Sequence, residues 1–229
     1  MTVQVVGLDG DDTLWRNEEY FAASQQAFRD LLAPYVNGDI DVDERLEAKE
    51  RANLELFGYG VKGFTLSLIE TAIEVTSGRV TGDVVQALLD IGKGMLQQPV
   101  ELIEGVAETI PLLAEHYRLV VITKGDLWNQ EQKLARSDLA ELMWGVEIVA
   151  EKDLATYQRI LRRYDVDPAT FVMVGNSVRS DILPVLEAGG RAVHIPHELT
   201  WALEVAEHDG SVPTLHSIKE LPSWLEEHG

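Results

Sequence analysis

Short apolar runs alternate with amphipathic segments over most of the chain. Apolar runs rich in β-branched side chains and flanked by turn residues are typical of buried strands. The sequence predicts five such strands, at Val3–Leu8, Leu119–Thr123, Val146–Val149, Phe171–Gly175 and Ala192–Ile195. Helical periodicity marks the segments between them, at Gly105–His116, Asn129–Leu142, Thr156–Tyr164 and Ser180–Ala188. Strands that alternate with helices indicate right-handed crossovers and an α/β fold, with a doubly wound parallel sheet covered on both faces.

One long stretch breaks this alternation. Residues 18–98 carry helical patterns and no convincing strand, and the candidate helices are Tyr20–Tyr35, Asp43–Phe57, Phe64–Thr76 and Thr81–Met95. Because structureless loops of this length are rare in compact domains, the stretch is predicted to be a helical insert. We therefore expect a core of residues 1–17 and 99–229, interrupted after its first strand by a helical domain of residues 18–98. The expected boundaries or hinges are Asn37-Gly38 and Gly92/Gly94 through Pro99.

Charge and composition narrow the classes of partner. The 229 residues include 19 basic and 39 acidic ones, which gives a formal net charge of -20. Such a field repels nucleic acids and anionic membrane surfaces, so we expect neither as a partner, and it makes a local cation more necessary at any site for an anionic substrate. The absence of Cys excludes disulfides and thiol chemistry. With no signal-like N-terminus and no apolar run of about 18 residues, a cytoplasmic protein is expected. Its oligomeric state is left open between a monomer and a homodimer.

Carboxylates gather at the mouth of the first predicted strand. Residues 7–15 read Gly-Leu-Asp-Gly-Asp-Asp-Thr-Leu-Trp. Like charges at close range disfavour the compact state, so such a cluster indicates that a cation neutralises it and that the carboxylates do chemistry. Alternate residues of an extended segment share a face, which brings Asp9, Asp11 and Thr13 together. A calcium-binding loop would need further oxygen ligands and a Glu at its twelfth position, whereas apolar residues follow here.

Asp9-x-Asp11-x-Thr13 after an apolar strand resembles the first motif of the haloacid dehalogenase-like hydrolase superfamily. Three further segments resemble its other motifs, in order and each at the end of a predicted strand: Thr123-Lys124-Gly125, Lys152 and Gly175-Asn176 through Asp181. Active sites of open parallel sheets form at these carboxyl ends. A helical insert after the first strand resembles the first-type cap of this superfamily, which closes over the active site.

The resemblance implies a Mg²⁺-dependent phosphatase that hydrolyses a small phosphorylated metabolite through an aspartyl-phosphate. Asp9 is the expected nucleophile and Asp11 the expected general acid and base. The expected Mg²⁺ ligands are oxygens of Asp9, Asp11 (through its backbone carbonyl), Asn176 and Asp181. The residues expected on the phosphoryl group are Thr123, Lys124, Gly125 and Lys152. Lys62, in a Gly-rich turn of the insert, is either a further substrate contact or part of a flexible connector.

Asp11 distinguishes the phosphatase branch of the superfamily from its dehalogenase and phosphonatase branches. An alkoxide leaving group needs a proton, whereas a halide does not, and the dehalogenase and phosphonatase branches lack an Asp at this position. Asn176 departs from the fourth motif, which usually has Asp there, and Asn176→Asp is expected to tighten Mg²⁺ binding. Two alternatives stay open: a phosphomutase built on the same core, and a catalytically silent module that binds phosphate.

Residues near the motifs have simpler interpretations. Asp12 points away from the face of Asp9 and is expected to be solvated or to cap the next turn. Trp15 is expected to pack between core and cap rather than to line the pocket. His194 lies in a predicted strand and is expected to be structural, and His197 is expected to be a loop residue outside the site.

Overall fold

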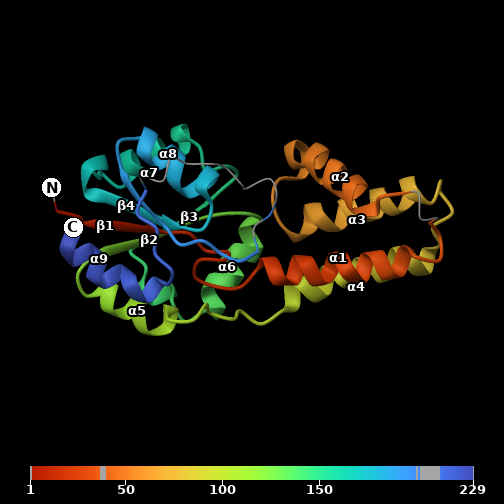
Figure 1. Ribbon diagram of the computed structural model, residues 1–229, viewed down its shortest axis with the longest axis horizontal. Helices are drawn as coiled ribbons and strands as arrows, with labels where there is room; N and C mark the ends of the chain where they lie inside the picture. Colours follow the sequence, from red (N-terminus) through yellow and green to blue (C-terminus); the bar gives the residue numbers. More distant parts are fainter. Residues whose placement is uncertain (1, 37–39, 200, 202–211, 229) are drawn as a thin grey trace. The chain divides into compact units, whose positions relative to one another are not determined.

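The computed structural model describes residues 2–36, 40–199, 201 and 212–228, and the chain divides into two compact units (Figure 1). The first unit comprises residues 1–18 and 100–229, and the second comprises residues 19–99. The second unit is therefore inserted into the first after a single strand. Asn37-Gly38, one of the two expected boundaries, lies outside the described residues.

A five-stranded parallel sheet forms the centre of the first unit. Its strands are β1 (Val5–Leu8), β2 (Arg118–Lys124), β3 (Gly145–Val149), β4 (Phe171–Gly175) and β5 (Arg191–His194). Their order is β3-β2-β1-β4-β5, and all neighbouring pairs are parallel. The predicted α/β class with a doubly wound sheet is confirmed. The chain adds strands on one side of β1 and then on the other, and sheets of this kind bind ligands beside that switch point.

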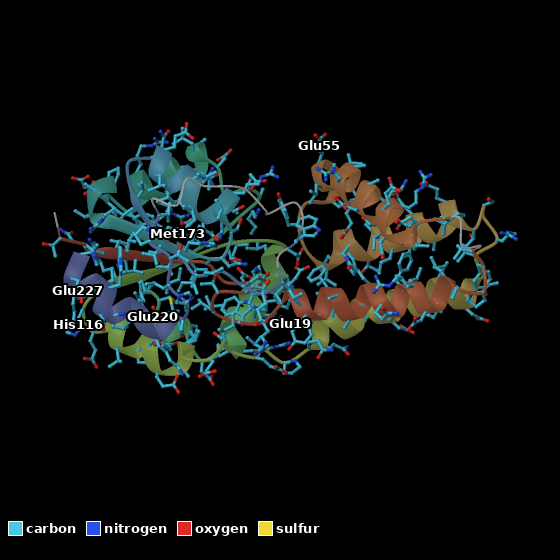
Figure 2. The ribbon with its side chains drawn as sticks, viewed as in Figure 1. Glu19, Glu55, His116, Met173, Glu220 and Glu227 are labelled. Carbon is cyan, nitrogen blue, oxygen red and sulfur yellow. The ribbon has the colours of Figure 1, made fainter. Side chains whose placement is uncertain are left out.

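Helices cover both faces of the sheet (Figure 1). They are α5 (Val106–Ala114), α6 (Leu127–Arg136), α7 (Leu154–Arg163), α8 (Leu183–Glu187) and α9 (Leu221–His228). Because side chains alternate along a strand, Val6 packs with α5 and α9 on one face, whereas Val5 packs with α7 and α8 on the other. Met173 of β4 lies inside this core, while Glu220 and Glu227 lie at the surface (Figure 2).

Two helices of the first unit differ from the prediction. The segment predicted as one helix to Leu142 is α6, which ends at Arg136, followed by a short 3-10 turn at Ala140–Leu142. The Ser137 hydroxyl donates to the carbonyl of Leu134 (2.8 Å), and Asp138 takes a left-handed conformation that ends the helix. The segment expected as one helix from Ser180 is a π-helical turn at Val178–Ile182 followed by α8.

The second unit is built from helices, and none of its described residues forms a strand. Its helices are α1 (Glu18–Leu32), which begins at the last residue of the first unit, α2 (Val42–Phe57), α3 (Val61–Val75) and α4 (Gly82–Gln97). Phe28, Leu68 and Leu88 are fully buried in their shared core. Gly92 and Gly94 lie inside α4, whereas Pro99, the end of the second expected boundary segment, is the last residue of the second unit. A Cβ on Gly92 would collide with the Thr65 side chain of α3.

The two segments that lead out of and back into the first unit run side by side. The Arg16 amide donates to the Glu101 carbonyl (2.9 Å), and the Ile103 amide donates to the Leu14 carbonyl (3.0 Å). This antiparallel contact fixes the loop that follows β1. No helix among the described residues is long and apolar enough to span a bilayer.

Candidate active site

The candidate site lies at the carboxyl ends of β1 and its neighbours. The loop after β1 turns tightly, because the amides of Leu14 and Trp15 both donate to the carbonyl of Gly10 (2.8 and 3.2 Å). The Asp9 amide donates to the carbonyl of Val174 on β4 (2.9 Å). Asp9 is thereby held between the ends of two adjacent strands, directly beside the fourth motif.

Three buried charges meet at this point. Lys152 Nζ contacts both Asp9 Oδ1 and Asp181 Oδ1, the latter at 2.7 Å. The three residues are 6% (Asp9), 3% (Lys152) and 0% (Asp181) exposed. Asp9 Oδ2 accepts from the Thr13 hydroxyl (3.1 Å), and Asp181 Oδ2 accepts from the Ser177 amide (3.0 Å). Burying charge is costly unless it is paired, and here one ammonium faces two carboxylates.

The excess of negative charge shifts the pKa values of Asp9 and Lys152. Burial raises the pKa of Asp9 to about 7, with a contribution from the negative charge of Asp181, although Lys152 opposes the shift. Burial alone would lower the pKa of Lys152, but Asp181 and Asp9 outweigh it and hold that pKa above its usual range. Lys152 is therefore a fixed cation, whereas Asp9 is a carboxyl group that a further positive charge would ionise.

The oxygens around this cluster fit a magnesium ion. Asp9 and Asp181 offer carboxylates, and the half-buried Asn176 offers an amide oxygen that accepts from the Thr13 hydroxyl (3.4 Å). Hard oxygen donors at a site with excess negative charge are what Mg²⁺ prefers. Gly175 makes room for this set, because a Cβ there would collide with the Asp181 carboxylate.

The Asp11 carboxylate is held by three donors. Its Oδ1 accepts from Trp15 Nε1 (2.6 Å) and from Lys133 Nζ (2.7 Å), and its Oδ2 accepts from Gln130 Nε2 (3.2 Å). Trp15 packs in the core of the first unit, 1% exposed, so its ring is buried there while its indole N–H is used by Asp11. The sequence reasoning missed Gln130, Lys133 and the donor role of Trp15. One signal was available, since Gln130 stands one turn before Leu134 on the inward face of α6.

The residues after β2 connect Asp11 to the other motifs. Thr123 is buried, and its Oγ1 accepts from Gln130 Nε2 (2.7 Å). Lys124 Nζ donates to the Ser180 hydroxyl (2.9 Å), beside the fourth motif. Gly125 takes a φ of 135°, which a residue with a side chain rarely adopts. Thr123 and Lys124 thus lie at the same edge of the sheet as Asp9.

Lys62, the remaining expected contact of the substrate, belongs to the second unit. It is an exposed residue in the first turn of α3, and its proposed contact with substrate stays a prediction.

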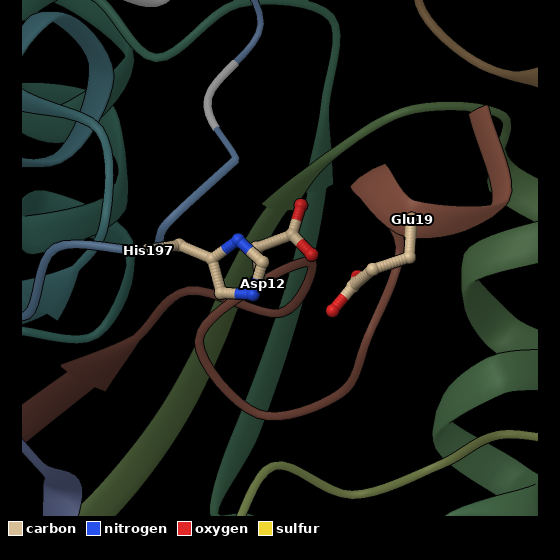
Figure 3. A group of neighbouring side chains, drawn as sticks. All are labelled: Asp12, Glu19 and His197. Carbon is tan, nitrogen blue, oxygen red and sulfur yellow. The ribbon is translucent and has the colours of Figure 1, made fainter. Parts of the chain in front are cut away.

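Asp12 is buried rather than solvated, and its carboxylate lies beside the His197 ring (Figure 3). Its Oδ1 accepts from the amides of Asn17 (2.8 Å) and Glu18 (3.0 Å), so it caps the segment that enters α1. Burial raises its pKa to about 6, although these N–H groups and His197 lower it. The His197 ring lies within 4.8 Å of this carboxylate, whereas the His194 ring lies 3.0 Å from the Asn176 carbonyl.

The sheet order and the acidic loop after β1, with Lys152 and Asp181 meeting that loop, define a hydrolase of the haloacid dehalogenase type. The model of the haloacid dehalogenase-like hydrolase family matches residues 3–189. The chain belongs to this family, as its motifs predict.

Solved structures of similar proteins support the assignment to this family. The solved structure of a haloacid dehalogenase-like family hydrolase from Xanthomonas campestris is 42% identical, with a TM-score of 0.87 over 99% of this chain and 91% of that one. A 2-haloacid dehalogenase from Pseudomonas syringae pv. Tomato DC3000 shares the fold, with a TM-score of 0.67 and 24% identity over the whole of both chains.

A glyceraldehyde 3-phosphate phosphatase from Methanothermobacter thermautotrophicus is 36% identical over 123 residues. That match covers 51% of this chain and 54% of the phosphatase, so it spans about half the length of that relative.

Proposed function

We propose that this chain is a Mg²⁺-dependent phosphatase that hydrolyses a small phosphate monoester through an aspartyl-phosphate on Asp9. The observation that carries the proposal is the buried contact of Lys152 with both Asp9 and Asp181. Two buried carboxylates that share one cation destabilise a folded core. A phosphoryl-transfer site nevertheless needs this combination of nucleophile, metal ligand and fixed positive charge.

The residues divide the reaction into two steps. Asp9 attacks phosphorus, the bond from phosphorus to the ester oxygen breaks, and Asp11 gives its proton to the departing alkoxide. Asp11 then takes a proton from water as that water attacks phosphorus, and the bond to Asp9 breaks to release inorganic phosphate. Lys152 and the Thr123 hydroxyl stabilise the charge that develops on the phosphoryl oxygens.

A divalent cation held by Asp9, Asp181, Asn176 and the Asp11 carbonyl would neutralise the phosphoryl group and keep Asp9 ionised. With a pKa of about 7, Asp9 is partly protonated at neutral pH, but a nucleophile must be ionised to attack. A bound cation would lower this pKa, which supports the assignment.

Asp11 favours a phosphate ester over a haloacid as the substrate. A halide departs without a proton, so a dehalogenase would gain nothing from a carboxylate two residues after its nucleophile. The likeness to the glyceraldehyde 3-phosphate phosphatase also supports a small phosphorylated substrate. The helical unit of residues 19–99 is proposed to act as the cap that selects this substrate, with Lys62 as its candidate contact.

The proposal is tested by phosphate release from an aryl and an alkyl phosphate ester, with Mg²⁺ and with EDTA. We expect metal-dependent release by the wild type and none by Asp9→Asn, while Asp90→Asn, which alters an exposed carboxylate, keeps full activity. Release that persists in Asp9→Asn would refute the nucleophile. Chloride release from a 2-haloacid, isomerisation of a sugar phosphate without hydrolysis, or binding of phosphate without turnover would each point to another function.

A further inference from the structure

Two polar side chains on one face of α6 donate hydrogen bonds to the Asp11 carboxylate. Lys133 Nζ lies 2.7 Å from Asp11 Oδ1 and 2.8 Å from the side-chain oxygen of Asn17. The side chains of Lys133 and Asp11 are 18% and 27% exposed, so their contact is largely shielded from water. A charge-assisted hydrogen bond of this kind is stronger and more directional than a neutral one.

Gln130, three residues earlier on the same helix face, supports the same carboxylate. Its Nε2 reaches Asp11 Oδ2 (3.2 Å), Thr123 Oγ1 (2.7 Å) and the Lys124 carbonyl (2.9 Å). Its Oε1 is buried and has no hydrogen-bond partner among the described residues. The amide is therefore oriented so that its nitrogen, and not its oxygen, faces Asp11 and Thr123.

The start of α6 fixes this arrangement. Asp126 caps the helix by accepting from the Asn129 amide (3.1 Å), which places Gln130 in the first turn and Lys133 in the next. A Cβ on Gly125 would stand 3.2 Å from Gln130 Cγ, so the glycine leaves room for that side chain. The local structure therefore directs both polar side chains toward the loop after β1.

We propose that Lys133 is a positioning residue that orients the Asp11 carboxylate for proton transfer to the leaving alkoxide, with Gln130 and Trp15 completing its cradle. This inference rests on the proposed phosphatase function. Proton transfer requires the carboxyl oxygen within hydrogen-bond reach of the departing oxygen, and a misplacement of about 1 Å can lower a rate 100-fold. Without Lys133, Oδ1 would be held by Trp15 alone among the described residues, and the orientation of the Asp11 carboxylate would be less constrained.

The leaving group separates this role from a general effect on the site. The ratio kcat/KM reports the steps up to release of the alcohol, and only a poor leaving group needs the proton of Asp11 in those steps. We expect Lys133→Met to lower kcat/KM about 10- to 100-fold on an alkyl phosphate and less than about threefold on an aryl phosphate. Lys133→Arg should keep most of the activity on the alkyl phosphate. Arg136→Met, at an exposed position one turn along α6, should leave kcat/KM unchanged on both substrates.

A double-mutant cycle completes the test. Because Asp11→Asn cannot complete turnover, the cycle follows the alcohol released in a single turnover, and in that background Lys133→Met should cause no further loss on the alkyl phosphate. Equal falls on both substrates, an unchanged alkyl rate, or an additive loss in the Asp11→Asn background would overturn the proposal. Lys133→Gln, which keeps a polar side chain, gives the same comparison if Lys133→Met does not fold. If the wild type releases no phosphate, or Asp9→Asn retains release, the phosphatase function itself fails, which is a separate outcome.

Discussion

Asp9→Asn is expected to abolish turnover and yet to stabilise the metal-free protein at alkaline pH. Asp9 is buried and its pKa is about 7 in the folded chain, against 3.8 for the unperturbed group. Between these values the folded state binds more protons than the unfolded state. The free energy of unfolding therefore falls as pH rises from about 4 to about 7, and the stability present at acid pH is lost above that window.

The size of the effect follows from the shift. One pKa unit corresponds to about 1.4 kcal/mol, so ionising Asp9 in the folded state costs about 4 kcal/mol at pH 8. Asn has nearly the same shape and carries no charge to bury. The variant should recover part of this cost at about pH 8 and gain little at about pH 5, where the folded wild type is already protonated at Asp9.

Urea unfolding in EDTA at several pH values measures this difference. The gap between Asp9→Asn and wild type should widen as pH rises, whereas the gap between Asp90→Asn, at an exposed carboxylate, and wild type should stay constant. Saturating Mg²⁺ should reverse the order, because the ion binds the folded wild type more tightly than the variant. A constant gap across the pH range would refute the reasoning about Asp9.

Three further predictions follow from the same cluster. Lys152→Met leaves two buried carboxylates without their cation, so it should lower the free energy of unfolding in EDTA by about 3–5 kcal/mol, measured in urea, and an unchanged midpoint would contradict this. Asn176→Asp should tighten Mg²⁺ binding in calorimetric titration, and weaker binding would exclude this position as a ligand. Gly175→Ala should weaken Mg²⁺ binding because its Cβ would displace the Asp181 carboxylate, so unchanged affinity in the same titration would argue against Asp181.

The core was predictable because its signals are local. Buried parallel strands require continuous apolar runs, and each strand end carries a polar motif, so the sheet and the approximate places of Asp9 and Lys152 could be read from the sequence. The end of α6 was not predictable from the sequence, because it depends on the Ser137 hydroxyl and on the left-handed conformation of Asp138.

The surroundings of the site needed the tertiary structure. Asp11 and Lys133 are 122 positions apart, and no periodic pattern relates them. Alternation along an extended segment places Asp12 opposite to Asp9, but the tight turn at Gly10 buries the Asp12 carboxylate instead. Trp15 reads as an ordinary core residue, and only the fold reveals that its N–H serves Asp11.

The most direct test of the central claim is the mass of Asp11→Asn after incubation with an aryl phosphate and Mg²⁺. An aryl leaving group departs without a proton, so this variant should still phosphorylate Asp9, but it lacks the base that activates water. We predict a chain heavier by one phosphoryl group, with the modification on the peptide that contains Asp9 and absent from the Asp9→Asn/Asp11→Asn double variant. A wild type that releases phosphate while Asp11→Asn stays unmodified, or an adduct that survives in the double variant, would contradict the account.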